Sequence, residues 1–235
     1  MVGTGLDLEY DRKVTSVQLQ TKPESRSIQA LRRGLATLHS RAQAMGALPA
    51  GRIAESHDQP TEGAGLRRLV EGLQQADLLA SADVDLAPLL VETPQDLDTD
   101  TAERMLAQVN RMVEALDHSP SPRTEWAPMR ATLGDEALGL LVGVAEVSLR
   151  RYAAGTRQTP QRIAERLHWL ALVVADLAGG YNDFGIRRWF ERPRSQLQGQ
   201  SPRQTLGEEW GVDDAAALRV RALASALTGA QALAV

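Results

Sequence analysis

The chain has 235 residues, of which 43% are apolar and 24% charged, and its formal net charge is −4. These values are ordinary for a soluble globular protein, so they exclude wholesale disorder and a fibrous repeat. The absence of cysteine excludes disulfides, thiolate catalysis and cysteine-based zinc sites, and the four histidines are scattered without metal-ligand spacing. We therefore expect no metal, no cofactor and no enzymatic activity.

The sequence indicates neither a membrane span nor a signal peptide. The longest apolar runs, at 138–145 and 170–175, are far shorter than the roughly 20 residues that cross a bilayer. The N-terminus has no apolar stretch between a basic start and a small-residue cleavage site. The sequence therefore predicts a cytoplasmic protein without a membrane partner.

Residues 1–120 combine helical periodicity with an excess of acid, since they hold 18 acidic against 12 basic residues. Apolar residues recur at steps of three and four along 23–45, 66–76 and 102–116. Each stretch therefore predicts an amphipathic helix. We expect an acidic helical region over residues 1–120, and the sequence does not indicate its role.

Other signals in this region are local. Asp100 and Glu103 have the spacing of a capping box at the start of the third helix. Residues 47–64 lose the helical pattern and contain proline and glycine, which predicts a loop. The segment VTSVQLQ at 14–20 is the only weak candidate for a strand.

The segment DHSPSPR at 117–123 is the best linker candidate, because two prolines and two serines disfavour a continuous helix. Apart from Tyr10, all aromatic residues lie between 126 and 210. Aromatic side chains bury the most area per residue, so the part after the linker is expected to hold the better-packed core. That part has 14 basic against 12 acidic residues.

Three short helices and a long one are predicted after the linker, in a domain over 124–178. The short helices run over 126–133, over 135–142, and from the Gly143 break to a stop at Gly155. The long helix has Thr159 as N-cap and Pro160 at its first position, and it ends at Gly179 and Gly180. The whole chain is therefore expected to be all-α.

The segment 136–155 has the pattern of a helix-turn-helix. Gly139 supplies a small residue where two steep helices touch, and Gly143 supplies the turn. The buried positions are expected to be Leu138, Val142, Val144, Leu149 and Tyr152. The side chains expected to face DNA are Glu146, Val147, Ser148, Arg150 and Arg151, with Arg157 in the following loop.

These residue types suit DNA. Arginine reads guanine through two parallel hydrogen bonds, Ser148 suits a base edge or a phosphate, and Glu146 is able to accept from cytosine N4. Five arginines stand against one glutamate over 148–168, which would draw this region to DNA. Two alternatives stay open, namely a helix-turn-helix that no longer binds DNA and two short helices that simply pack around a glycine.

The C-terminal part, over 181–235, predicts a small compact helical domain. Pro193 ends one short helix, Gly199 makes a turn, and Ser201 with Pro202 starts another short helix. Asp213 or Asp214 is expected to cap the last helix, whose buried side would include Leu218, Val220 to Ala222, and Leu227.

The residues of this domain also carry a family resemblance. The order and spacing of Trp189, Pro193, Leu197, Gly199, Ser201, Pro202 and Leu206, followed by a helix rich in alanine, valine and leucine, resemble the toxin-binding domain of the Xre/MbcA/ParS antitoxins. Such antitoxins often carry a helix-turn-helix on the N-terminal side of this domain, as predicted here. The resemblance covers about residues 126–235.

The resemblance implies an antitoxin that neutralises a partner toxin, typically of the RES-domain class that uses NAD, by placing its C-terminal segment over the toxin's active-site cleft. It also implies that the helix-turn-helix represses the shared operon. We expect a homodimer on operator DNA, because one helix-turn-helix alone would bind too weakly. The acidic region over 1–120 departs from the compact family members. It leaves open whether the chain is an ordinary antitoxin or a diverged regulator.

The toxin-binding residues that the resemblance implies are Trp189, Phe190, Arg192, Pro193, Arg194, Leu197, Gly199, Pro202 and Leu206. The two aromatic residues would anchor or pack the binding surface, and the arginines would meet acidic or nucleotide-binding groups. The alternative is that the aromatics are core and that the domain is a helical cap or dimerisation element. In that case the protein would be a stand-alone repressor whose N-terminal helices mediate oligomerisation.

Overall fold

The computed structural model describes residues 26–48, 62–78 and 98–231. It confirms the all-α fold, because the described part contains helices and no strand. The elements are α1 (Arg26–Ala44), α2 (Glu62–Gln75), α4 (Thr99–Asp117), α5 (Pro122–Leu133), α6 (Asp135–Val142), α7 (Glu146–Ala153), α8 (Gln161–Ala178), α9 (Asp183–Glu191), the 3₁₀ turn η1 (Ser195–Leu197), α10 (Pro202–Leu206) and α11 (Ala215–Gln231). The strand candidate at 14–20 and most of the predicted loop at 47–64 lie outside the described residues. Within those ranges no helix has the length and apolarity to cross a membrane.

The N-terminal cap of α4 differs from the sequence prediction, whereas that of α10 agrees with it. The N-cap of α4 is Asp98, whose carboxylate accepts from the Thr101 backbone N–H at 2.8 Å, and the box predicted on Asp100 and Glu103 is wrong. This hydrogen bond and a second one from the Thr101 hydroxyl hold the pKa of Asp98 below its usual value. By contrast, the predicted start of α10 is confirmed, because Ser201 and Gln204 form a capping box ahead of the helix.

The start of α8 shifts by one residue. Pro160 has extended backbone and occupies the N-cap, so the helix begins at Gln161. The predicted N-cap, Thr159, is engaged elsewhere, since its hydroxyl accepts from Trp126 Nε1 at 3.0 Å. The side chain thus ties the start of α8 to α5 instead of capping the helix.

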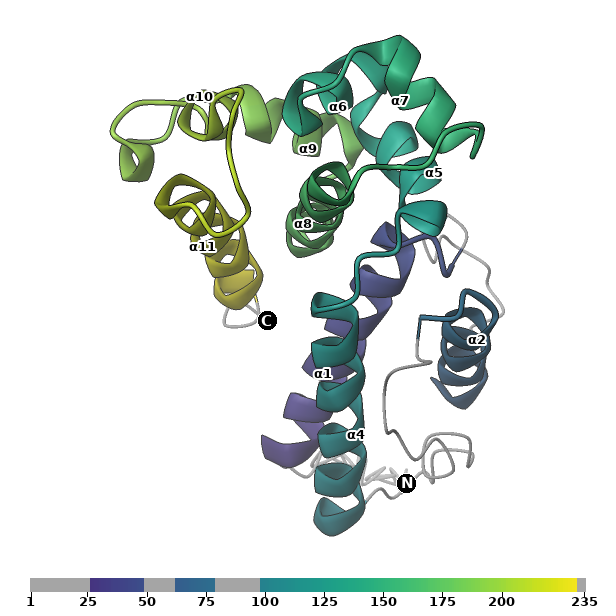
Figure 1. Ribbon diagram of the computed structural model, residues 1–235. Helices are drawn as coiled ribbons and strands as arrows, with labels where there is room; N and C mark the ends of the chain where they lie inside the picture. Colours follow the sequence, from purple (N-terminus) through teal and green to yellow (C-terminus); the bar gives the residue numbers. More distant parts are fainter. Residues whose placement is uncertain (1–25, 49–61, 79–97, 232–235) are drawn as a thin grey trace, which may run out of the picture.

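Helix α8 lies at the centre of the fold, with α11 on one side and α5 on the other (Figure 1). The sequence predicted a single apolar stripe on this helix, but every residue from Arg166 to Leu177 is buried. The reason is that α1, α5 and α11 all pack against it, with smaller contributions from α6 and α9. The main core of the molecule surrounds α8 and includes the tryptophans at 126, 169, 189 and 210.

A second apolar cluster joins α1, α2 and α4, and it includes Leu172 of α8. Helices α1 and α4 approach closely at Gly34, where a Cβ atom would lie 3.1 Å from Val109 Cγ1. The predicted linker at 117–123 is reduced to the short connection between α4 and α5. The N-terminal helices therefore share α8 with the rest of the chain, and the division at residue 120 stays a prediction.

Helix α11 buries only part of the predicted face, since Val220 is buried and Leu227 is partly buried against the core, while Leu218 and Ala222 are exposed. Its buried residues are Ala217, Val220 and Ala224, while Leu218 is 57% exposed. The carboxylate of Asp214 accepts from the Gly211 backbone N–H at 2.7 Å and so orders the turn ahead of the helix. The prediction for Leu218 is wrong because a one-residue shift along a helix rotates a side chain by about 100°.

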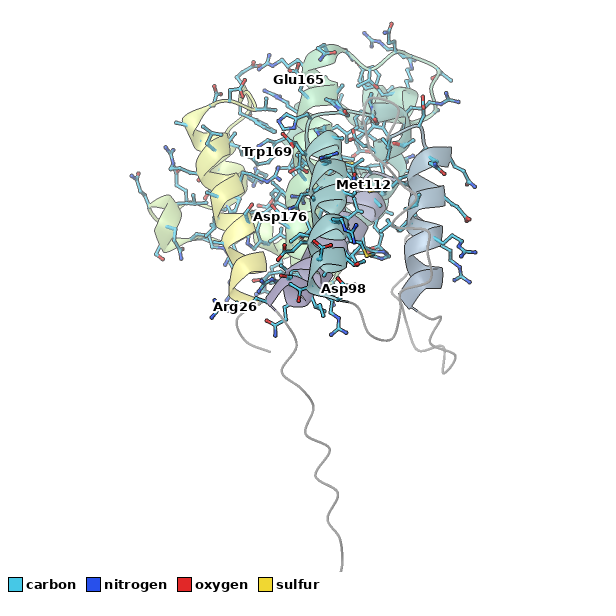
Figure 2. The ribbon with its side chains drawn as sticks, turned by 90° about the horizontal axis from the view of Figure 1, so that it is seen from below. Arg26, Asp98, Met112, Glu165, Trp169 and Asp176 are labelled. Carbon is cyan, nitrogen blue, oxygen red and sulfur yellow. The ribbon has the colours of Figure 1, made fainter. Side chains whose placement is uncertain are left out.

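A buried charge cluster connects three parts of the chain. The Arg41 guanidinium of α1 donates to Asp176 Oδ1 of α8 and to Asp117 Oδ1 of α4, each at 2.8 Å. On the opposite side of the same carboxylate, Asp176 Oδ2 accepts from Arg221 Nε at 3.1 Å and from Ser225 Oγ at 2.8 Å, both on α11. Figure 2 shows Asp176 on the central helix. Burial lowers the pKa of Arg221, and the nearby Asp176 carboxylate opposes this effect.

A second buried polar pair lies nearer the N-terminal end of α8. His168 Nδ1 is 2.6 Å from Glu125 Oε1 of α5, and Nε2 donates to the Asp117 carbonyl at 3.1 Å. Both residues are almost fully buried. His168 is thus a core histidine that joins α8 to the α4–α5 connection.

The cluster yields a test of stability. Changing Asp176 to Ala removes one of the two carboxylates of the buried Arg41 guanidinium and the acceptor of Arg221 Nε and Ser225 Oγ, so we expect the free energy of unfolding to fall by about 3 kcal/mol. The matched control is Asp100→Ala, which removes the carboxylate beside the exposed Arg104 and should cost about 1 kcal/mol or less. Urea unfolding measures both. Equal losses in the two variants would contradict a structural role for the cluster.

Candidate functional site

The turn between α6 and α7 has the geometry that the sequence predicts. Gly143 has φ +78° and ψ 41°, which is left-handed backbone that favours glycine. The backbone N–H groups of Gly143 and Val144 both donate to the Gly139 carbonyl at 2.9 Å. A Cβ atom at Gly139 would lie 2.9 Å from the Val144 carbonyl oxygen, so α6 and the backbone of the turn approach each other at a position that only glycine fits.

The inner face of this pair packs on α5 and α8. Leu138, Val142, Leu149 and Tyr152 are buried as predicted, and Val144 is half-buried. The Tyr152 ring stacks on Trp126 of α5 at a centroid distance of 6.1 Å. Because α5 and α8 also pack against each other, α7 is held on a rigid frame.

Two residues that the sequence reasoning missed hold the end of α6. The buried Arg166 of α8 donates from Nη1 to the Val142 carbonyl at 2.9 Å, and from Nε and Nη2 to the Trp210 carbonyl, with the Nε bond at 2.7 Å. Trp210 Nε1 donates to the Leu141 carbonyl at 2.8 Å. These bonds satisfy carbonyl groups at the C-terminal end of a helix, where a cation is also favoured. Burial lowers the pKa of Arg166 from its usual value.

The signal for Arg166 is its position in the sequence. It stands between Ile163 and Leu170 at helical steps of three and four, which places a charged residue on the apolar stripe of α8. A charge at such a position indicates a buried group with specific partners. Nothing in the sequence indicates that the partner is the carbonyl of Trp210.

The outer face of α7 is open to solvent. Glu146, Val147, Arg150 and Arg151 are exposed, and Val147 is 63% exposed despite being apolar. Ser148 is half-buried. The structure thus places all five residues predicted on this helix on or near one exposed surface, which we call the α7 face.

Arg157 lies just beyond α7 and is exposed. Its guanidinium lies over the Tyr152 ring, 5.4 Å from the centroid. The contact is a cation–π interaction that limits the motion of the side chain, and Arg157 makes no ion pair with the carboxylates that the structure describes. Arg157 therefore keeps its positive charge uncompensated beside the α7 face.

Arg150 has different surroundings. Its Nε donates to Asp135 Oδ2 at 3.2 Å and its Nη2 to Glu146 Oε2 at 2.9 Å. Asp135 is itself held by Arg130 of α5 through bonds of 2.7 and 3.0 Å. The Arg130 hydrogen bond keeps the pKa of Asp135 below its usual value, and the bond from Arg150 adds to the effect. Arg151 makes no ion pair or hydrogen bond through its side chain with the part of the chain that the structure describes.

The structure places the predicted toxin-binding residues in two environments. Trp189, Phe190, Leu197, Pro202 and Leu206 are buried. The rings of Trp189 and Phe190 meet edge to face at 5.2 Å. The side chains of Trp189 and Phe190 fill the core, so a role as exposed anchors is wrong, and the packing of the surface from beneath stays a prediction.

The other four residues of that set are accessible. Arg192, Pro193 and Gly199 are exposed, and the half-buried Arg194 lies over the Trp189 ring at 5.5 Å. A partner that binds the folded domain would therefore meet these four residues. The five buried residues of the set would pack beneath this accessible surface and support it.

No cluster of three or more histidine, aspartate or glutamate side chains suited to a metal ion is found among the described residues. Comparisons with models of known protein families, with curated proteins and with solved structures find no match.

The turn is open to a direct test. Changing Gly143 to Ala strains its left-handed backbone and places a Cβ atom 2.5 Å from Arg166 Nη1, whose own hydrogen bonds prevent it from moving away. The matched control is Gly155→Ala, since Gly155 has φ +68° and open space around its Cβ position.

We expect a loss of about 1 kcal/mol in unfolding free energy for the Gly155 variant, and of about 3 kcal/mol for the Gly143 variant. Urea midpoints at constant slope measure the difference. If both glycines prove equally tolerant, Arg166 does not hold the turn in the way described.

Proposed function

We propose that this chain is a DNA-binding regulator of the antitoxin type. Its α6–α7 pair would bind operator DNA as a homodimer and repress its own operon. Its C-terminal domain would neutralise a partner toxin, with a toxin of the RES-domain class as the leading candidate. Both activities would take place in the cytoplasm without enzymatic chemistry by this chain.

The observation that carries the DNA-binding half of this proposal is the α7 face. A helix-turn-helix presents the N-terminal residues of its second helix to base edges, and here those residues are exposed on a helix that packs against α5 and α6. Arg151 and Arg157 supply positive charge without a carboxylate partner among the described residues. The exposed Val147 would supply an apolar contact for a thymine methyl group.

The toxin-binding half rests on the sequence resemblance, supported by the exposed positions of Arg192, Pro193 and Gly199. These residues lie next to each other at the end of α9 and around η1. An arginine on a rigid, proline-containing surface is a common interface residue. The family mechanism, in which the C-terminal segment covers an active-site cleft, is proposed for residues 228–235.

A second candidate is a stand-alone repressor with no toxin partner. The burial of Trp189, Phe190 and Leu197 favours it, because residues that match the toxin-binding pattern serve here as core. In that reading, the C-terminal domain acts by holding Arg166 and Trp210 against the turn. The two candidates share the same DNA-binding face and differ only in the partner.

The DNA-binding proposal predicts different effects for two arginines. Arg150→Ala should weaken binding to a specific operator by about 1–3 kcal/mol. Arg157→Ala should weaken binding to all sequences and lower the slope of log K against log salt by about 1, since it would remove a phosphate contact. Gel-shift titrations with the promoter fragment and with unrelated DNA measure both effects.

The control for these titrations is Arg111→Ala, which removes an exposed arginine from α4, far from α7 in the sequence. It should change neither the affinity nor the salt slope beyond the effect of net charge. Equal, weak and salt-sensitive binding of the unmodified protein to every duplex would refute a specific repressor.

The toxin-binding proposal predicts the effect of a truncation. Deleting residues 228–235 leaves Ala217, Val220 and Ala224, the buried side chains of α11, in place. We therefore expect the thermal midpoint and DNA binding to be retained while neutralisation of the neighbouring gene product is lost. Co-expression followed by co-purification, with growth rescue as the second readout, measures the loss.

The same experiment separates the two candidates. If the neighbouring gene is harmless alone, or if the full chain does not co-purify with its product, the stand-alone repressor is favoured. If the truncated chain still rescues growth, the C-terminal segment is not the neutralising element.

A further inference from the structure

The hydrogen bonds of Arg150 leave a defined part of its guanidinium free. Of its five N–H groups, the one on Nε is used by Asp135 and one on Nη2 by Glu146. Both N–H groups of Nη1 and one of Nη2 have no partner among the described residues. Nη1 and Nη2 form the outer edge of the guanidinium, which matches the O6 and N7 acceptors of guanine.

The orientation of this edge is set from the scaffold. Asp135 stands at the first position of α6 and is fixed by two bonds to Arg130 of α5, at 2.7 and 3.0 Å. Through Asp135, the rigid α5 therefore determines where the Arg150 head group lies. Glu146, one turn earlier on α7, holds it from the second side. A side chain ordered in this way before binding loses less rotamer freedom on contact with a base.

The charge balance around Arg150 argues against a phosphate contact. Arg130 and Arg150 carry two positive charges, and Asp135 and Glu146 carry two negative charges, so the four side chains together are neutral. A neutral group gains little from a general polyanion. Arg151 and Arg157, without such carboxylates, are better suited to that attraction.

We infer that Arg150 is the guanine-reading side chain of α7 and that Asp135 is the positioning residue that aims it. The inference rests on the proposed DNA-binding function and adds the residue pair that sets its sequence specificity. It assigns sequence discrimination to Arg150 and general attraction to Arg151 and Arg157. It also gives the acidic start of α6 a role other than helix capping.

The test uses the full chain and a pool of duplexes randomised over the span of a half-site. Selection with the unmodified protein should yield one guanine position per half-site at which replacement costs about 5- to 150-fold in affinity, and Arg150→Ala should abolish that preference. Asp135→Asn should lower the guanine preference by about tenfold. Asp135→Glu, which keeps the carboxylate, should restore part of it.

A matched control is Asp100→Asn, because Asp100 also pairs with an arginine at 3.2 Å but lies on α4. It makes the same change in net charge away from the α7 face, so it reports the effect of net charge alone and should leave the guanine preference intact. Thermal unfolding of both variants establishes that they are folded under the assay conditions. The ratio between cognate and substituted duplexes is a readout that a loss of stability alone would not change.

Three outcomes would overturn the inference. If Asp135→Asn binds every duplex more tightly and keeps its guanine preference, the carboxylate withholds Arg150 from DNA instead of aiming it. If Arg150→Ala retains the preference, another residue reads the guanine. If the unmodified protein selects no sequence at all, the proposed DNA-binding function fails together with the inference, and that result is distinct from specific binding that Asp135 does not affect.

Discussion

Helix α8 is buried on all sides from Arg166 to Leu177, and the rest of the structure depends on this constraint. Three polar side chains are buried along this helix, and a buried polar or charged group is tolerated only with suitable partners. Arg166 takes its partners from the end of α6 and from Trp210, His168 from α5 and the end of α4, and Asp176 from α1 and α11. Each partner comes from a different part of the chain, so these parts are fixed relative to one another.

This arrangement links the α7 face to the C-terminal domain by direct contact. The Leu141 and Val142 carbonyls at the end of α6 accept from Trp210 and Arg166, and the turn at Gly143 follows at once. A change in the loop that carries Trp210 would leave the Leu141 carbonyl and the Nε and Nη2 groups of the buried Arg166 without these partners, which is costly. The loop that carries Trp210 is therefore part of the support of the turn, whether or not a protein partner binds nearby.

Much of the fold was predictable from the sequence because apolar periodicity reports helices and glycine reports turns. The helices, the contact at Gly139 and the turn at Gly143 all follow from these two signals. The buried ion pairs were not predictable, because an arginine in sequence does not reveal whether it is solvated or buried. Arg41 and Arg166 each stand on an apolar stripe, which is the only available signal, and it does not name the partner. Trp189 and Phe190 were ambiguous for a related reason, since a large aromatic suits a core as well as an interface.

The N-terminal helices belong to the same packed unit as the candidate site. Leu172 of α8 is buried in the cluster formed with α1, α2 and α4, and Arg41 supplies one side of the Asp176 carboxylate. Without α1, the apolar Leu172 would lose the cluster that covers it, and Asp176 would retain only the α11 donors among these contacts. Because α8 also carries Arg166, a loss of packing at one end of the helix acts on the element that holds the turn at the other. The described N-terminal helices therefore contribute to the packing of α8 and, through α8, to the support of the turn.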